Sequence, residues 1–131
     1  MSKYETTGGI PTLAGTHAKL LDLLDQLTDL AKQQIDPAAP RSELYTRMIT
    51  CIDELIDQSA VIAHLHNTED TPRDRSLNQG WLAVSFAMQT IRTMTTLLTK
   101  TLHQPQAWRD MVLELQAMKH KIKSLMERTL N

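Results

Sequence analysis

Apolar side chains recur along four stretches of this chain at alternating steps of three and four residues. In the first two stretches these positions are Leu13, His17, Leu20, Leu24, Leu27, Ala31, and then Tyr45, Met48, Ile52, Leu55, Ser59, Ile62, His66. In the last two they are Leu77, Trp81, Val84, Met88, Ile91, Thr95, Leu98, Leu102, and then Trp108, Met111, Leu115, Met118, Ile122, Leu125, Thr129. Such a repeat is typical of helices that pack with a left-handed supercoil. It predicts an all-α fold, an antiparallel four-helix bundle with left-handed heptad-type packing.

Polar residues and prolines between these stretches give the expected boundaries. Thr12 and Ser42 are candidate N-caps, and Pro105 stops the third helix because proline has no amide hydrogen to donate. The polar segment NTEDTPRDRSLN is expected to be the one long connector, and its length leaves the handedness of the bundle open. We expect a flexible N-terminal tail at 1–11 and a single bundle domain at 12–131, with helices at about 12–35, 42–66, 77–102 and 106–130.

Length and composition agree with one small domain. A chain of 131 residues can bury one sizeable core, and the single Cys51 excludes an internal disulfide. The N-terminus has no apolar segment of the secretory type, so we expect a cytoplasmic protein. The third helix has a single charge, Arg92, over residues 76–99, but its many polar side chains do not suit a membrane span.

Charge is distributed unevenly along the chain. Residues 1–70 hold five basic and eleven acidic groups, whereas residues 71–131 hold nine basic and four acidic groups. The two halves therefore carry net charges of −6 and +5. This predicts either two solvated halves that attract each other across the bundle or a docking surface for a charged partner.

The acidic side chains of the helices lie away from the apolar seams, which argues against catalysis in the core. Only Glu114 directly flanks a seam. The chain has no inward pair of carboxylates for acid–base chemistry and none of the Glu-x-x-His pairs that di-iron bundles use. It also has no zinc-protease, phosphate-loop or dinucleotide motif. We therefore expect no enzymatic activity and no cofactor.

Some seam positions hold residues other than aliphatic ones. Ser59, Thr95 and Thr129 are expected to donate to a backbone carbonyl one turn back. The methionines are spread over three helices, mostly on or beside a seam, and are expected to fill the core, with an adaptable groove as a secondary role.

Two histidines on the seams form a candidate site at one end of the bundle. Antiparallel pairing brings His17, near the start of the first helix, close to His66, at the end of the second. Glu69 and Asp70 follow just beyond, so the four residues could bind a metal or a polar ligand. The simpler expectation is that both histidines hydrogen-bond to backbone or water, since two inward ligands are too few for a closed zinc site.

The third helix offers the most suggestive surface. Leu82 and Phe86 lie on its outer side, followed by Gln89 and Thr93, on a helix nearly free of charge. An exposed aromatic residue with few charges around it is typical of interface cores. The alternative is that the N-terminal tail or the long connector covers this face.

These features favour a small cytoplasmic protein–protein interaction module, such as an adaptor, regulator or chaperone-like protein. It would self-associate through Leu82, Phe86, Gln89 and Thr93, most simply as a homodimer. The alternative is a ligand- or metal-binding bundle that uses His17 and His66 at one end of the bundle. The third possibility is nucleic-acid binding through the basic residues of the fourth helix, although these wrap around the helix without stacking aromatics: Lys119, His120, Lys121, Lys123 and Arg128.

Overall fold

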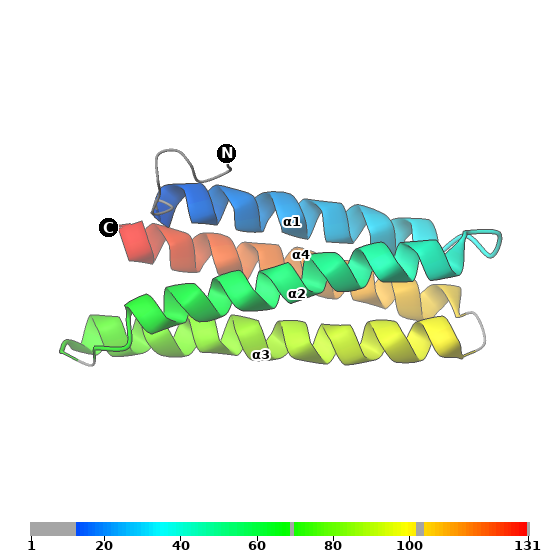
Figure 1. The fold of residues 1–131 in the computed structure, drawn as a ribbon. Coiled ribbons are helices and arrows are strands. Elements are labelled where there is room, and N and C mark those ends of the chain that lie inside the picture. The colour runs from blue at the N-terminus through cyan, green and yellow to red at the C-terminus, as the bar shows by residue number, and fades with distance from the viewer. Residues whose placement is uncertain (1–12, 69, 102–103, 131) are drawn as a thin grey trace.

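A computed structural model describes residues 13–68, 70–101 and 104–130, and over these residues the chain is all-helical, with no strand. Its connections alternate between the two ends of the molecule, and the start of α1 lies at the same end as the last turn of α4 (Figure 1). The predicted tail at 1–11 lies outside the described residues. The four helices are α1 (Leu13–Gln34), α2 (Arg41–Leu65), α3 (Pro72–Lys100) and α4 (Pro105–Leu130).

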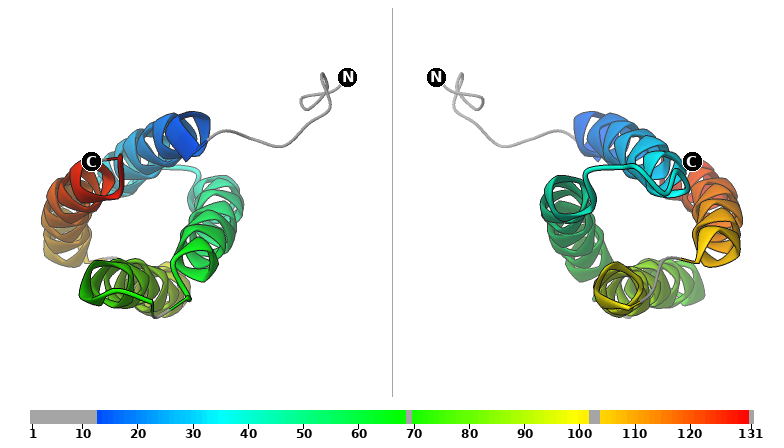
Figure 2. Two further views of the ribbon diagram at one scale, coloured as in Figure 1. Left: turned by 90° about the vertical axis from the view of Figure 1, so that its left-hand side faces the viewer. Right: turned by 90° about the vertical axis from the view of Figure 1, so that its right-hand side faces the viewer.

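The helices stand in a ring in which each packs against two neighbours (Figure 2). Helix α1 packs along α2 and α4, and α3 packs along the same two helices, whereas the backbones of the diagonal pairs stay apart within the described chain. The contact between α2 and α3 is the most extensive of the four, and the contact between α3 and α4 is the least. The α3–α4 side is therefore the loosest side of the bundle.

The apolar seams form the core, as predicted. Asp25 and Asp53, which the heptad pattern places on the outside, have side chains that are 56% and 50% exposed. Each buried aliphatic side chain contributes about 1.5–3 kcal/mol by leaving water. The largest fully buried side chains all occupy predicted seam positions: Trp81, Trp108, Leu20, Leu24, Leu27, Met48, Ile52, Leu55, Ile62, Leu77, Met88 and Leu115.

Helix α3 begins at Pro72, so the prediction that it starts at 77 is wrong. The Thr71 hydroxyl accepts a hydrogen bond from the Asp74 amide at 3.0 Å and donates to Asp74 Oδ2 at 3.1 Å. This reciprocal cap satisfies orphan groups of the first turn, and a proline suits the first helical position. The long connector is correspondingly shorter than expected.

The predicted cap of α2 is also wrong. Helix α2 begins at Arg41 after Pro40, no side chain caps its first turn, and Ser42 lies inside the helix. The Ser42 carbonyl instead accepts a hydrogen bond from the Thr46 hydroxyl at 3.1 Å. Thr12, the other predicted cap, lies outside the described residues. The end of α4 at Leu130 agrees with the prediction, and the other helix ends differ from it by one or two residues, which is the usual uncertainty of such boundaries.

Two of the three small polar residues on the seams make the predicted hydrogen bond to a backbone carbonyl, and the third does not. Ser59 donates to the Leu55 carbonyl at 2.8 Å, and Thr129 donates to the Leu125 carbonyl at 2.7 Å, as expected. The fully buried Thr95 hydroxyl has no partner in the described part of the molecule, so the prediction fails there. A buried hydroxyl without a partner lowers stability, and Thr95 marks a weak layer of the core.

Candidate functional sites

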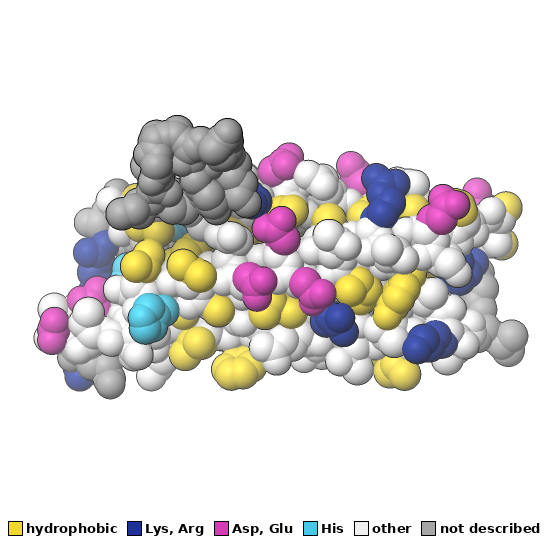
Figure 3. All heavy atoms as spheres, in the orientation of Figure 1, with side chains coloured by type: hydrophobic (Ala, Val, Ile, Leu, Met, Phe, Trp, Pro, Cys, Tyr) yellow, Lys and Arg dark blue, Asp and Glu magenta, His cyan; other side chains and the backbone are white. Residues whose placement is uncertain are grey.

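The outer side of α3 exposes the four residues that the sequence singles out. Phe86, the only phenylalanine of the chain, is 63% exposed, and Leu82 is 37% exposed. Gln89 and Thr93 are exposed on the same side of the helix. Hydrophobic side chains protrude along the lower margin of the molecule, which α3 forms (Figure 3). We call these four residues the α3 face.

The α3 face continues an unusually apolar surface. Of the eight large hydrophobic side chains that are exposed in the described residues, four belong to α3. One of them, Leu97, extends the α3 face towards the C-terminal end of the helix, whereas Met94 lies on the side of α3 that faces α4. Helices α2 and α4 hold two each, Val61 and Leu65 on α2 and Leu113 and Leu130 on α4, and the described residues of α1 hold none.

The one charged residue in the middle of α3 points away from this face. The Arg92 side chain contacts α2, where its Nε donates to Asp53 Oδ1 at 2.7 Å. That hydrogen bond and the Asp53 charge raise the pKa of the guanidinium. The surface from Leu82 to Leu97 is therefore both apolar and uncharged, as interface cores are.

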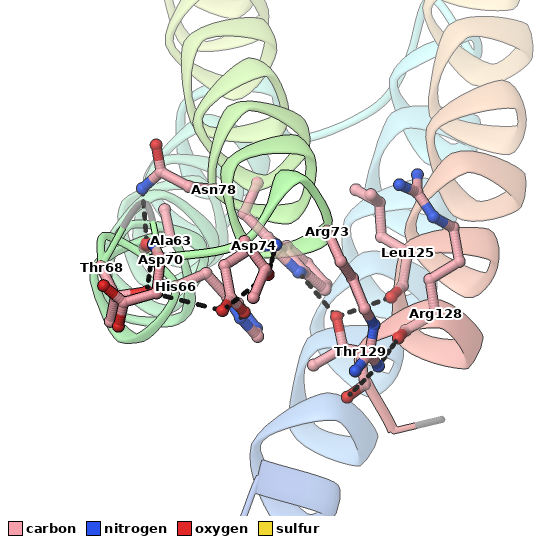
Figure 4. Close-up of polar contacts among 12 residues, drawn as sticks. Ala63, His66, Thr68, Asp70, Arg73, Asp74, Asn78, Leu125, Arg128 and Thr129 are labelled. Atoms are coloured by element: carbon pink, nitrogen blue, oxygen red, sulfur yellow. Dashed lines mark hydrogen bonds and ion pairs between the residues drawn. The ribbon is translucent and has the colours of Figure 1, made fainter.

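The second candidate site lies where α1 and α3 begin and where α2 and α4 end. The buried His17 ring stacks on the buried Trp81 ring, with centroids 5.6 Å apart and planes 18° apart. The Trp81 indole donates to Thr129 Oγ1 on α4 at 3.1 Å. His66 Nδ1 lies 3.5 Å from Asp74 Oδ1 (Figure 4). The structure thus places the two predicted histidines in one corner of the bundle.

Three ring nitrogens in this corner are buried without a hydrogen-bond partner among the described residues: both nitrogens of His17, and Nε2 of His66. Burial lowers the pKa of the His17 imidazole, and the charge of His66 acts in the same direction. His17 is therefore held neutral. Neutral imidazole nitrogens are good ligands for transition metals, but two are fewer than a closed site uses.

The two acidic residues predicted for this site, Glu69 and Asp70, are not seen to contribute to it. Glu69 lies outside the described residues, and Asp70 is exposed on the connector, where its amide donates to Thr68 Oγ1 at 3.3 Å. No three of the described histidine, cysteine and acidic residues are arranged to hold a metal ion. The sequence reasoning missed Asp74 as the partner of His66. The Thr71-Pro72 cap could have revealed it, because an earlier start of α3 brings Asp74 to the bundle end.

Several polar contacts close this end of the molecule. Asn78 Nδ2 donates to the Ala63 carbonyl at 2.6 Å, which ties α3 to α2. Arg73 Nη2 donates to the Arg128 carbonyl (Figure 4). Arg128 Nη2 in turn donates to Ser76 Oγ at 2.7 Å. A cation on the last carbonyls of a helix stabilises its C-terminus, so Arg73 holds the end of α4 in place.

The basic residues of α4 are partly engaged inside the molecule. Lys119 Nζ lies 2.7 Å from Asp25 Oδ1 on α1, an ion pair that joins the basic half of the chain to the acidic half. Lys121 and Lys123 are exposed, but the one tryptophan of this helix, Trp108, is fully buried. This arrangement provides no stacking platform beside the basic residues, so no observation favours nucleic-acid binding.

The single cysteine is not a reactive site. Burial raises the pKa of the Cys51 thiol, and although Arg47 opposes this shift, Glu54 and Asp22 add to it. A raised pKa leaves the thiol protonated, and the protonated form is a poor nucleophile.

Comparison with models of known protein families, with curated proteins and with solved structures gave no match. Among the helices that the structure describes, none combines the length and the apolar character needed to cross a membrane. Any functional proposal therefore depends on the two sites above.

Proposed function

We propose that this chain is a small cytoplasmic protein–protein interaction module, of the adaptor, regulator or chaperone-like kind, that forms a homodimer through the α3 face. In this proposal the four helices form an antiparallel bundle with left-handed heptad-type packing, which serves as a rigid support. The role is non-enzymatic in this proposal, because no pair of acidic side chains in the described part of the chain faces the core to act as acid and base.

The observation that carries the proposal is the 63% exposure of Phe86 on an uncharged helix surface. A phenylalanine in water is costly, and its burial against a partner gains about 1.5–3 kcal/mol. The neighbouring Leu82 and Leu97 enlarge the area that a partner would bury. Aromatic side chains at the centre of such an area typically supply most of the binding energy.

A two-fold axis fits the order of side chains on this surface. With the axis near Gln89 and Thr90, two α3 helices run in opposite directions, and Leu82 of one copy meets Leu97 of the other. Phe86 then packs on Thr93 of the second copy. No like charges meet within this stretch, since the Arg92 side chain is engaged by Asp53. A symmetric pairing of one surface with itself is the commonest form of assembly in soluble proteins.

Sedimentation velocity over a concentration series tests this proposal with two matched variants. Phe86→Glu places a charge in the α3 face, whereas Leu113→Glu places one at an equally exposed leucine of α4. We expect the parent protein and Leu113→Glu to be dimers at high micromolar concentration. Phe86→Glu should remain monomeric with unchanged helicity, because burying an unpaired carboxylate is strongly unfavourable.

Two results would contradict the proposal. One is a parent protein that sediments as a monomer at high micromolar concentration. The other is a dimer that both glutamate variants weaken equally, which would place the contact elsewhere.

A second candidate function, a metal- or ligand-binding bundle, is favoured by the three buried nitrogens of His17 and His66 that lack partners. The Asp74 carboxylate next to His66 Nδ1 would leave Nε2 free to bind, as carboxylates beside metal-ligating histidines do. Thermal unfolding with added zinc or nickel tests this function. A rise in melting temperature that disappears in the His17→Ala/His66→Ala variant would support it, and an equal rise in both proteins would refute it.

A further inference from the structure

A groove of about 400 Å³ opens between α3 and α4, on the loosest side of the bundle. Its floor and walls are apolar and rich in methionine, and two carboxylates lie at its edge. The residues that matter for the argument are Ile91 and Met94 from α3, and Met111, Met118, Asp110 and Glu114 from α4. A volume of this size is within the range of small-molecule sites in proteins.

The groove arises from a change in side-chain size along the α3–α4 contact. At Gly80 the two helices are tightly packed, since a Cβ atom there would lie 2.6 Å from Leu125 Cδ2. Farther along, the small side chains of Ala87 on α3 and Ala107 on α4 line open space instead. The groove is thus part of the helix packing.

The groove is too narrow for a helix. The side chains of Ile91, Met111 and Met118 on the floor are only 6–9% exposed. A ligand can therefore contact only a small apolar area there. A helix with its side chains is about 10 Å wide and would rest on the rims. A slender alkyl chain or a single aromatic ring fits better, and methionine sulfur makes favourable contacts with aromatic rings.

The charged residues at the edge of the groove are both acidic. Asp110 and Glu114 line the groove from α4, and no lysine or arginine of the described chain lines it. Asp110 Oδ1 accepts a hydrogen bond from Gln106 at 2.9 Å, and Glu114 has no ion-pair partner within the described ranges. Glu114 is also the one acid that the sequence pattern places beside a seam. Two carboxylates above an apolar floor are complementary to a cation with an apolar body.

We propose that this groove binds a small amphipathic cation, an amine with an aromatic or short alkyl body. The apolar body enters between Met94 and Met111, and the ammonium group remains at the edge beside Asp110 and Glu114. This site is separate from the α3 face and does not depend on self-association.

Three probes with the same body and different head groups test the proposal: 4-phenylbutylamine, 4-phenylbutanol and 4-phenylbutyrate. Titration is followed by the methyl NMR signals of Met94, Met111 and Met118. We expect saturable binding of the amine in the millimolar range, weaker binding of the alcohol, and at least about tenfold weaker binding of the carboxylate. Asp110 and Glu114 are both exposed, so each carboxylate contributes only a factor of a few to this preference.

Two charge variants separate a local effect from a general one. Asp110→Asn/Glu114→Gln removes both carboxylates of the groove. Asp57→Asn/Glu127→Gln removes two exposed acids elsewhere and changes the net charge by the same amount. We expect the first variant to bind the amine no better than the alcohol, and the second to retain the preference of the parent protein.

Three results would overturn the proposal: no saturable shift of the three methionine signals by the amine, an equal loss of preference in both charge variants, or carboxylate binding as tight as amine binding. A fourth is dissociation of a dimer by Asp110→Asn/Glu114→Gln, because the groove would then belong to an interface with a second copy. Failure of the α3 face to mediate assembly would leave this site unaffected, so the two proposals fail independently.

Discussion

The two ends of the bundle each bury one tryptophan completely, but the surroundings of the two indoles differ. At the end where α3 begins, Trp81 donates to Thr129 and stacks on His17. At the opposite end, the Trp108 N–H has no acceptor among the residues that the structure describes. The hydroxyl of Thr95, a core residue of the C-terminal part of α3, is likewise without a partner there.

The same contrast holds for the α3–α4 contact. Near Trp81, arginine side chains join α3 to α4, and Gly80 allows the helices to pack closely. Towards Trp108 the contact opens into the methionine-lined groove. In the α3–α4 contact, the end near Trp81 is thus held by specific polar contacts, whereas the described residues that line the contact towards Trp108 are mostly apolar. Specific contacts fix a geometry, whereas looser apolar packing leaves room for a ligand.

The largest expected difference between the ends concerns the tryptophans themselves. Trp81→Phe removes the indole donor together with ring contacts, and we expect it to lower the free energy of unfolding by about 2–3 kcal/mol. Trp108→Phe removes a donor that has no acceptor, so we expect a loss of only about 1 kcal/mol. Urea unfolding of both variants measures this difference. Equal losses would show that the polar contacts of Trp81 do not distinguish the two ends.

The next effect concerns His17, whose two buried ring nitrogens lack partners among the described residues at an end of the bundle that is otherwise rich in hydrogen bonds. His17→Phe keeps a ring that can stack on Trp81 and removes two buried nitrogens without partners. We expect the variant to be more stable than the parent protein by about 1–2 kcal/mol at neutral pH. Thermal and urea unfolding provide the measurement. A destabilised variant would mean that the His17 nitrogens make favourable contacts in solution.

The same residue predicts a dependence on pH. Burial lowers the pKa of folded His17, so the unfolded chain takes up its proton at higher pH, near the ordinary histidine value of about 6.5. The His17 contribution is therefore constant above this pH. Below it, the unfolded state binds more protons, and the free energy of unfolding falls by at most about 1.4 kcal/mol per pH unit.

Urea unfolding between neutral pH and about pH 5 measures this slope. We expect His17→Phe to flatten it, whereas replacement of the exposed His120 by Phe should not. The same slope in the parent protein and in both variants would rule out His17 as the source of acid sensitivity.

The smallest expected effects compare the closed and open parts of the α3–α4 contact. Gly80→Ala gains helix propensity but forces the tip of Leu125 to move, so we expect a change within about 0.5 kcal/mol. Ala87→Leu extends into the groove and should stabilise the bundle by about 0.5–1 kcal/mol. A destabilised Ala87→Leu variant would show that the groove is already filled by neighbouring side chains in solution.

The sequence predicted the helices and the core because both depend on local periodicity. The twelve largest fully buried side chains all lie on seams that the heptad pattern identified, although Leu30, Leu44 and the polar Gln34 are buried beside them. The start of α3 was missed because the Thr71-Pro72 cap was treated as part of a loop, although Asp74 three residues after Thr71 completes a capping pattern. That error also concealed the contact between Asp74 and His66.

The periodicity of the sequence could not predict the groove or the buried polar groups that lack hydrogen-bond partners. They depend on which small side chains face each other across α3 and α4, and a seam pattern does not specify the alignment of two helices to within one turn. The failed bond of Thr95 is similar. Its residue type predicts a backbone bond, but the side-chain rotamer is chosen by the surrounding core. The exposure of Phe86, by contrast, followed directly from its position outside the seam.

Symmetric pairing of the α3 face is tested most directly by a disulfide across the proposed two-fold axis. In a Cys51→Ser background, Gln89→Cys places one thiol near the axis of the dimer, and Leu113→Cys serves as an exposed control on α4. We predict that mild oxidation of dilute protein links Gln89→Cys into covalent dimers quickly and almost completely, while Leu113→Cys links slowly. Equal, slow linking of the two variants would contradict the proposed dimer.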